Sequence, residues 1–225
     1  MDFGKYQDIA EHMKANLSEN NCLHTYRVLN YALQILDTEK EANAEVVILA
    51  VLLHDIGRMK KTSEDSEGES GHAQKGGKKS NELLAEKGYS EEITNQVSEC
   101  IISHSRSDKN EPQTLEAKIL FDADKLDMTG AVGIARAIIS GRAGKPLYLI
   151  DEDGFPLKGK KKETPSLLRD YKQELEKISG VFYTAKAQKI AAKHQKTMDA
   201  YFEQLVREVD KNHENGMKLL HKYCK

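Results

Sequence analysis

The sequence contains no tryptophan and only three cysteines, and these absences already restrict what kind of protein it encodes. Cys22, Cys100 and Cys224 are odd in number and far apart, with no C-x-x-C spacing. This pattern indicates a reducing compartment rather than a disulfide framework. The first eight residues lack the apolar segment that is typical of a secretory signal. We therefore expect a cytoplasmic protein.

Long apolar segments are also missing, because no stretch approaches the roughly 18–20 residues that are needed to cross a bilayer. The formal net charge of −2 provides no overall field that would attract nucleic acid or an anionic membrane. We therefore expect neither as a partner, and affinity for an anionic substrate must come from local groups. Nothing in the composition settles the oligomeric state, so a homo-oligomer stays open.

Helical patterns dominate what is present, and strand signals are scarce. Apolar residues recur at the spacing of amphipathic helices, which predicts an all-α fold. The expected helices cover residues 3–18, 22–36, 42–55, 72–87, 90–103, a segment after Pro112, 134–139 and most of 166–222. Ser90 and the two glutamates after it resemble a helix start, because hydroxyl caps and acidic first turns stabilise helix N-termini.

The pattern changes in the last third of the chain. Residues 147–150 and 155–157 flank the polar sequence DEDG, which predicts a short β-hairpin or a loop. We expect a main domain at residues 1–143. Residues 144–225 would then form a mostly helical C-terminal extension that packs on the same domain.

Ionisable residues follow one of the expected buried helices. Residues 46–53 read VVILAVLL, and His54 and Asp55 come directly after them. Burial without a partner costs on the order of 2–7 kcal/mol for a polar group and more for a charge. A bound cation removes this cost, and imidazole with carboxylate suits Fe, Mn, Ni or Zn. Because neighbouring helical residues diverge by about 100°, both reach one ion only if the helix ends there, as Gly57 predicts.

Further ligand and substrate-binding residues surround this pair in the sequence. Arg27 shares a helical face with His24, and a metal beside a guanidinium suits a phosphate group. Asp124 adds a carboxylate from another helix, and Asp122 competes with it for that role. Two imidazoles and two carboxylates leave positions in an octahedral shell for water, which a catalytic metal requires.

The order of these residues resembles the HD-domain superfamily of metal-dependent phosphohydrolases. The matching strings are HTYRV at residues 24–28, LHDIG at 53–57, HS at 104–105, EAKILFDADKLD at 116–127 and GAVGIAR at 130–136. They are similar in particular to a branch of bacterial, nucleotide-cleaving HD hydrolases. The resemblance implies an all-α HD-domain helical bundle that binds a divalent ion, which could be Mn, Fe, Ni, Mg, Co or Zn. One ion is expected and a second stays open.

The resemblance also implies four metal ligands, which are His24, His54, Asp55 and Asp124. We prefer Asp124 to Asp122 because the family pattern places its ligand there. Asp127 would then either support a ligand or pack the helix.

The implied reaction is hydrolysis of a phosphoester or phosphoanhydride in a small phosphorylated substrate, a nucleotide by preference, by a metal-activated water. Asp55 would bind the metal and help to orient that water. Arg27 would stabilise charge on the phosphate, together with Arg58, Lys75 or Lys125.

His72 and His104 leave the number of metal ions open. Binuclear HD proteins hold a second ion with extra histidines at similar places. They often show two adjacent histidines where this chain has His104 followed by Ser105, so we expect both residues to line the pocket and bind substrate. A diiron HD-type oxygenase is the alternative enzyme, and it requires both as ligands. A non-catalytic nucleotide-binding regulatory module is the third hypothesis.

Overall fold

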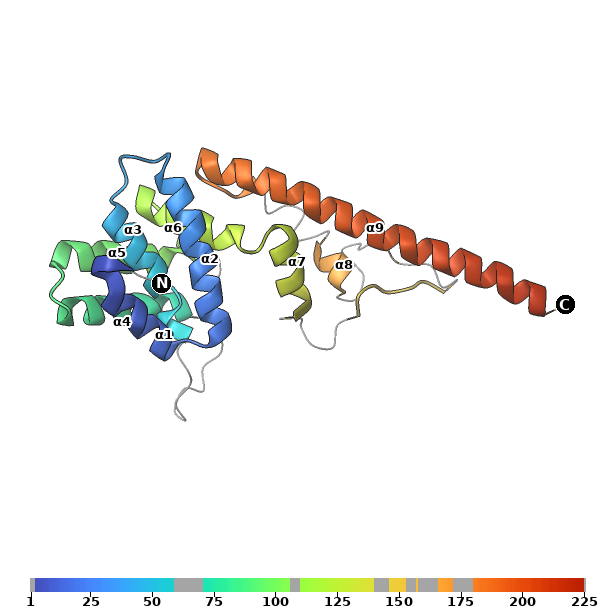
Figure 1. Cartoon of the computed structure of the whole chain (residues 1–225), viewed down its shortest axis with the longest axis horizontal. Coiled ribbons are helices and arrows are strands. Elements are labelled where there is room, and N and C mark those ends of the chain that lie inside the picture. Colours follow the sequence, from blue (N-terminus) through green and yellow to red (C-terminus); the bar gives the residue numbers. More distant parts are fainter. Residues whose placement is uncertain are drawn as a thin grey trace. The chain divides into compact units, whose positions relative to one another are not determined.

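A computed structural model describes residues 3–58, 71–105, 110–139, 146–152, 157, 166–171 and 180–224. The regular elements of these residues are helices, so the expected all-α class is confirmed (Figure 1). In chain order they are η1 (Gly4–Tyr6), α1 (Gln7–Asn16), α2 (Glu19–Leu36), α3 (Ala44–Leu53), η2 (Ile56–Arg58), α4 (His72–Glu86), α5 (Glu91–Ser103), α6 (Leu115–Leu126), α7 (Gly130–Ile139), α8 (Leu167–Asp170) and α9 (Ala185–Tyr223).

Short polar side chains fix the starts of the helices that carry the candidate site. The Ser18 hydroxyl accepts a hydrogen bond from a first-turn N–H of α2, and Ser90 does the same for α5, as its sequence predicts. Asn43 and Thr114 cap α3 and α6 in the same way. The first N–H groups of a helix have no partner within it, so each cap stabilises the protein by about 1 kcal/mol.

The chain forms two compact units, and the first consists of Met1–Asp127 together with Phe182–Ala187. Within it α3 and α6 contact each other and each contacts both α2 and α5, and α4 packs on α5 (Figure 1). Seven of the ten residues of α3 are buried. Burying a Val or Leu side chain stabilises the fold by about 1.5–3 kcal/mol. The apolar α3 therefore anchors the residues that follow it inside this unit.

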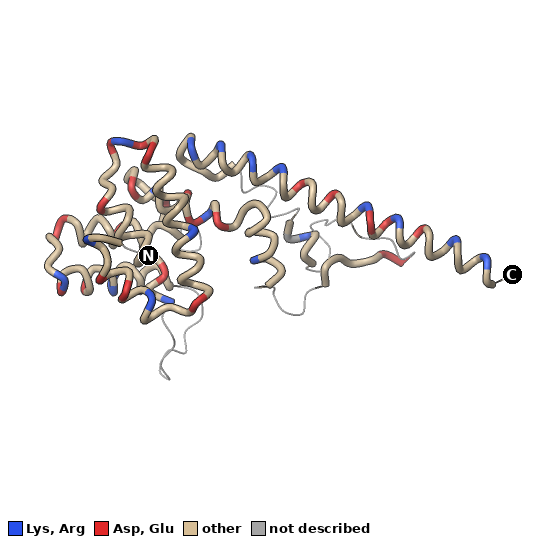
Figure 2. The backbone as a smooth tube through the Cα atoms, in the orientation of Figure 1, with Lys and Arg blue, Asp and Glu red and all other residues tan. Residues whose placement is uncertain are grey.

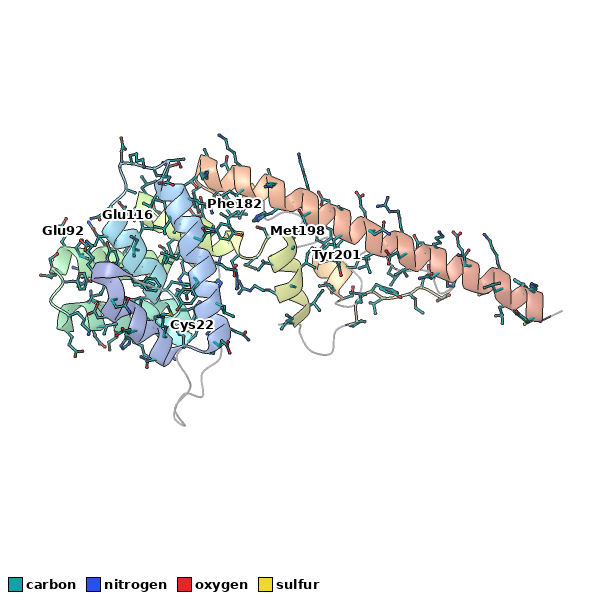
Figure 3. The ribbon with its side chains drawn as sticks, in the orientation of Figure 1. Cys22, Glu92, Glu116, Phe182, Met198 and Tyr201 are labelled. Atoms are coloured by element: carbon teal, nitrogen blue, oxygen red, sulfur yellow. The ribbon has the colours of Figure 1, made fainter. Side chains whose placement is uncertain are left out.

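The second unit consists of Met128–Val181 and Gln188–Lys225. Its buried cluster includes Tyr171 and Phe202, whose rings stack with centroids 3.8 Å apart, and Met198 from the side of α9 that faces α7 (Figure 3). Charged residues lie along the whole of α9 (Figure 2). Among the described helices, none is both long and apolar enough to span a bilayer. The division at residue 143 stays a prediction.

In the C-terminal third, where most of residues 166–222 were expected to be helical, the described helices are α8 and α9. Residues 181–184, just before α9, are not helical, and residues 172–179 lie outside the described part. In the described residues of the two expected hairpin arms, the Leu157 N–H donates to the Leu149 carbonyl at 2.7 Å. Its turn falls at residues 153–156, which are also outside the described part.

Gly130 and Gly133 do not interrupt α7, contrary to the expectation that the helix starts at residue 134. Gly130, at φ +67°, is the first residue of α7, and Gly133 lies inside it. A Cβ on Gly133 would lie 2.2 Å from the Met128 carbonyl oxygen. The glycine therefore permits a close approach of two backbone segments rather than marking a break.

Candidate metal centre

The end of α3 brings His54 and Asp55 to the same place. α3 ends at Leu53 and the 3-10 turn η2 starts at Ile56, so the helix terminates where the sequence requires it. Nε2 of His54 lies 3.8 Å from Oδ2 of Asp55, and both residues are buried.

Glycines allow α4 to approach this turn. A Cβ on Gly57 would lie 2.1 Å from the carbonyl oxygen of His72 and 2.9 Å from the backbone nitrogen of Gly76. Any side chain at residue 57 would push α4 away from η2. The close contact brings His72 beside Arg58, whose Nη2 lies 3.1 Å from His72 Nε2. Gly76, part of a KGGKKS sequence that lacks the spacing of a phosphate loop, thus has a packing role.

Neighbouring acceptors determine which nitrogens of two histidines carry protons. Nδ1 of His54 lies 2.8 Å from the Val51 carbonyl oxygen, which can only accept, so this nitrogen is the donor. Nδ1 of His24 lies 2.6 Å from a carboxylate oxygen of Asp127 and donates to it in the same way. The Nε2 atoms of both rings therefore present lone pairs, although they lie only 3.2 Å apart.

Two carboxylates complete this group of acceptors. Nε2 of His24 lies 3.2 Å from Oδ1 of Asp124 and 4.0 Å from Oδ2 of Asp55. Ligand atoms about 2.1 Å from one ion lie roughly 3.0 Å apart at 90° and about 4.2 Å apart when opposite. The observed separations fall in this range, and the ligand atoms of His24, His54 and Asp55 all lie within 4.8 Å of one another, so these three residues fit a divalent metal ion. Asp124 joins them through its contact with His24. Without a cation or an added proton, the facing lone pairs and negative oxygens would repel one another.

Burial and nearby charges favour the ligand forms of these groups. Burial lowers the pKa of His54 and lowers that of His104 to about 4, so both imidazoles are neutral near pH 7. Burial raises the pKa of Asp124, but the Lys125 ammonium acts against it, and the net pKa lies well below the usual value. The Lys125 ammonium donates to Oδ2 of Asp124 at 2.7 Å. The other oxygen of Asp124 is the one that faces His24.

A second group of candidate metal ligands also includes Asp55. Ligand atoms of Asp55, His72 and His104 lie within 4.8 Å of one another. The Arg58 guanidinium donates to Oδ1 of Asp55 at 2.7 Å and contacts Nε2 of His72. Burial raises the pKa of Asp55, but His54 and Arg58 outweigh it, and the net pKa is lowered. The Arg58 guanidinium therefore already contacts two of the residues, Asp55 and His72, that a second metal ion would need as ligands.

The guanidinium group of Arg27 is paired with Asp127, so only part of it can bind a ligand. Nε of Arg27 lies 2.6 Å from Oδ1 of Asp127, and Nη2 lies 3.1 Å from Oδ2. This bond raises the pKa of the guanidinium further. Asp127 is fully buried and also accepts a hydrogen bond from Nδ1–H of His24. Its carboxylate therefore supports a candidate metal ligand, which was one of the two roles expected for it.

Asp122 lies in a different environment from Asp124. Its oxygens accept hydrogen bonds from the backbone N–H groups of Tyr183 and Thr184, at 2.9 and 2.7 Å, and from the Thr184 hydroxyl at 2.7 Å. Burial raises its pKa, and these hydrogen bonds act against that effect. Asp122 thus anchors the segment that leads into α9. Local sequence carries no signal for this contact, because the partners lie 61 and 62 residues away.

Comparisons with known proteins point to one family. Residues 23–129 match the HD domain. Bacillus subtilis YpgQ, solved in complex with ADP, is 26% identical, with 90% of this chain and 93% of that chain covered and a TM-score of 0.68. An HD-superfamily hydrolase from Bacillus thuringiensis is 26% identical (91% and 96% covered, TM-score 0.67). A predicted HD-superfamily hydrolase from an uncultured Thermotogales bacterium is 25% identical (90% and 91% covered, TM-score 0.61). No functionally curated protein matched the sequence.

Proposed function

Because residues 23–129 of this chain match the HD domain, we propose that it is a metal-dependent phosphohydrolase that cleaves a phosphoester or phosphoanhydride bond of a small nucleotide. The observation that carries the proposal is a buried set of converging lone pairs and carboxylate oxygens with guanidinium groups beside it. The residues that would hold the ion are His24, His54 and Asp55, whose ligand atoms lie within 4.8 Å of one another. We add Asp124 to them because its Oδ1 lies 3.2 Å from Nε2 of His24.

The ion, when bound, supplies Lewis acidity and lowers the pKa of a coordinated water into the neutral range. The protein contributes the orientation of its ligands. The Val51 carbonyl and the Asp127 carboxylate accept hydrogen bonds from Nδ1–H of His54 and of His24. These bonds orient both rings so that their Nε2 atoms face the proposed metal site. Lys125 holds one oxygen of Asp124 and leaves the other to the metal. We assign Lys125 to this task rather than to direct binding of phosphate.

Arg27 and Arg58 are the cations that we assign to the substrate phosphate. Each is paired with a buried carboxylate through Nε, and each is about a third exposed, with side-chain exposures of 35% and 38%. The N–H groups that are not used in these pairs are available for phosphate oxygens, which guanidinium groups bind strongly. A carboxylate behind each guanidinium also fixes its position before the substrate arrives.

His104 has a different task from a phosphate-binding cation. Its Nδ1 lies 2.5 Å from the Ile101 carbonyl oxygen, so Nδ1 carries the proton and Nε2 is an acceptor. Burial lowers its pKa to about 4, so it is neutral near pH 7. A neutral acceptor repels phosphate oxygens but accepts a hydrogen bond from water. We therefore assign His104 to orienting a water molecule in the site.

The nucleotide is the finer part of the proposal. Its support is that YpgQ, 26% identical over most of both chains, was solved with ADP. The base, the sugar and the number of phosphates are left to experiment.

A diiron oxygenase is the second candidate, and the group formed by Asp55, His72 and His104 is the observation that favours it. Two stably bound irons would require Arg58 to leave Asp55 and His72. The contacts of Arg58 with both residues favour one ion and the hydrolase.

The test is hydrolysis by the metal-supplemented full chain across nucleoside mono-, di- and triphosphates, with metal content measured on the same sample. His54→Ala removes a proposed ligand. His12→Ala, on α1 and outside the cluster, is the matched control for loss of an imidazole. We expect turnover in the wild type and in the His12 variant and none in the His54 variant, with one metal per chain.

Other results would contradict the proposal. Two irons per chain without phosphate release would favour the oxygenase. Tight nucleotide binding without turnover under any metal would favour the regulatory module.

A further inference from the structure

Asp127 connects two groups that act on different parts of the proposed reaction. It follows directly after α6, and it contacts His24 and Arg27, which both lie on α2. Oδ2 accepts the Nδ1 proton of His24 at 2.6 Å, while Oδ1 accepts from Nε of Arg27 at 2.6 Å. Nη2 of Arg27 lies 3.1 Å from Oδ2, so the pair is bidentate.

The environment of Asp127 leaves its carboxylate little freedom. The side chain is fully buried, with an exposure of 0%. A buried carboxylate needs several donors, and α2 supplies them with an imidazole and a guanidinium one turn apart. Both oxygens are thus engaged within the protein, in contrast to Asp124, of which one oxygen faces the proposed metal. Any displacement of the Asp127 carboxylate displaces His24 and Arg27 together.

We propose that Asp127 is a positioning residue that couples metal binding to phosphate binding, because this single carboxylate fixes His24 and Arg27 relative to each other. For the metal, it holds the His24 ring with Nε2 toward the ion, and such partners typically change metal affinity by about 10- to 100-fold. For the phosphate, it sets the direction of the remaining N–H groups of Arg27. The phosphate half rests on the proposed function, whereas the metal half does not.

Asp127→Asn tests the coupling, since it keeps the volume but removes the negative charge and leaves one acceptor oxygen for two donors, His24 and Arg27. Mn²⁺ affinity is measured by electron paramagnetic resonance without substrate, and inorganic phosphate affinity by calorimetry on the Mn²⁺-saturated full chain. We expect both affinities to fall, Mn²⁺ affinity by about 10- to 100-fold. Mn²⁺ affinity within about twofold of the wild type would overturn the proposal.

Arg27→Gln separates the two arms of the coupling. It is expected to weaken phosphate binding while leaving Mn²⁺ affinity within about twofold of the wild type. In the Asp127→Asn background it should add little further loss of phosphate affinity, because the guanidinium is already misdirected. Fully additive losses in the double variant would contradict the coupling.

Asp122→Asn is the matched control, because it makes the same substitution in a buried carboxylate of α6 itself. It should lower the urea midpoint of unfolding without changing Mn²⁺ affinity. An equal loss of Mn²⁺ affinity in both variants would show that loss of stability, not of positioning, explains the effect. If Asp127→Asn does not fold, Asp127→Glu, which keeps the charge but moves it by one methylene, is expected to lose Mn²⁺ affinity, and unchanged affinity would overturn the proposal.

Failure of the proposed function gives a distinct result. A wild type that binds Mn²⁺ in an Asp127-dependent way but hydrolyses no nucleotide retains the metal half of the inference and contradicts the hydrolase.

Discussion

Helix α6 buries two carboxylates, Asp122 and Asp124, whose neighbours differ in whether they donate or accept hydrogen bonds. Among the described residues, the hydrogen-bond partners of Asp122 are donors, namely two backbone N–H groups and the hydroxyl of Thr184. Asp124, two residues further along, meets Lys125 with one oxygen and the lone pair of His24 with the other. The first environment is complete without any added group. In the second, Lys125 stabilises one oxygen of the carboxylate, and the oxygen that faces His24 is the one left for a metal ion.

The comparison teaches that the residue type and its burial do not identify a metal ligand. Both aspartates are buried and both lie in the same FDADKLD sequence. What distinguishes them is whether their neighbours donate or accept. A converging set of acceptors indicates a cation site, because such groups repel one another in a low-dielectric interior.

Of the substitutions considered, removal of the Asp124 carboxylate should have the largest effect on metal-dependent activity. In Asp124→Ala we expect metal-dependent hydrolysis to fall by at least about 100-fold, more than is typical for groups behind the ligands. Bound metal, measured after dialysis, should fall with it. Retained metal and turnover would remove Asp124 from the site.

Removal of Asp122 should affect stability instead. Asp122→Ala leaves the Tyr183 and Thr184 N–H groups without their acceptor, so we expect the free energy of unfolding to fall by about 3 kcal/mol. Urea unfolding measures this change. Mn²⁺ affinity of the folded variant should match the wild type, and a loss of metal would mean that the two sides of α6 are not distinct.

Acid should destabilise the metal-free protein through His104. Burial lowers its pKa to about 4 in the folded state, and the unfolded value is about 6.5. As the pH falls from 6.5 to 4, the unfolded chain binds the proton first. The His104 contribution to the free energy of unfolding is therefore present above pH 6.5 and decreases by up to about 3 kcal/mol as the pH falls through this range. His104→Gln should flatten the pH profile, and parallel profiles would contradict this account.

The smallest expected effect comes from Lys125, the donor that makes the Asp124 environment asymmetric. Lys125→Met removes the charge and retains most of the volume. We expect Mn²⁺ binding to weaken by about tenfold, which corresponds to about 1.4 kcal/mol. Tighter Mn²⁺ binding would show that the ammonium competes with the metal rather than orienting its ligand.

Much of the fold follows from local sequence. Periodicity predicted the helices of the first unit to within a few residues, and Ser90 predicted the start of α5. The interruption before α9 was not predicted, because it depends on Asp122 binding Tyr183 and Thr184 far along the chain. Gly133 was misinterpreted as a break, since its close contact with the Met128 carbonyl is visible only in three dimensions.

The residues of the candidate site likewise differ in how far local sequence could predict them. The pair His54 and Asp55 at the end of an apolar helix could be singled out from burial costs alone. The preference for Asp124 came from a family resemblance, and the metal-ligand assignments stay predictions. The link from Asp127 to His24 spans 103 residues, so local patterns could suggest a supporting role but not its partners. Such links depend on how α2 and α6 pack together.

The most direct measurement is a crystal structure of the Mn²⁺-loaded full chain with anomalous diffraction at the manganese edge. The account predicts one strong peak bounded by His24 Nε2, His54 Nε2 and a carboxylate oxygen from each of Asp55 and Asp124, with ligand distances of about 2.0–2.4 Å. A peak coordinated by Asp122, or a crystal with no manganese between the two histidines, would contradict it.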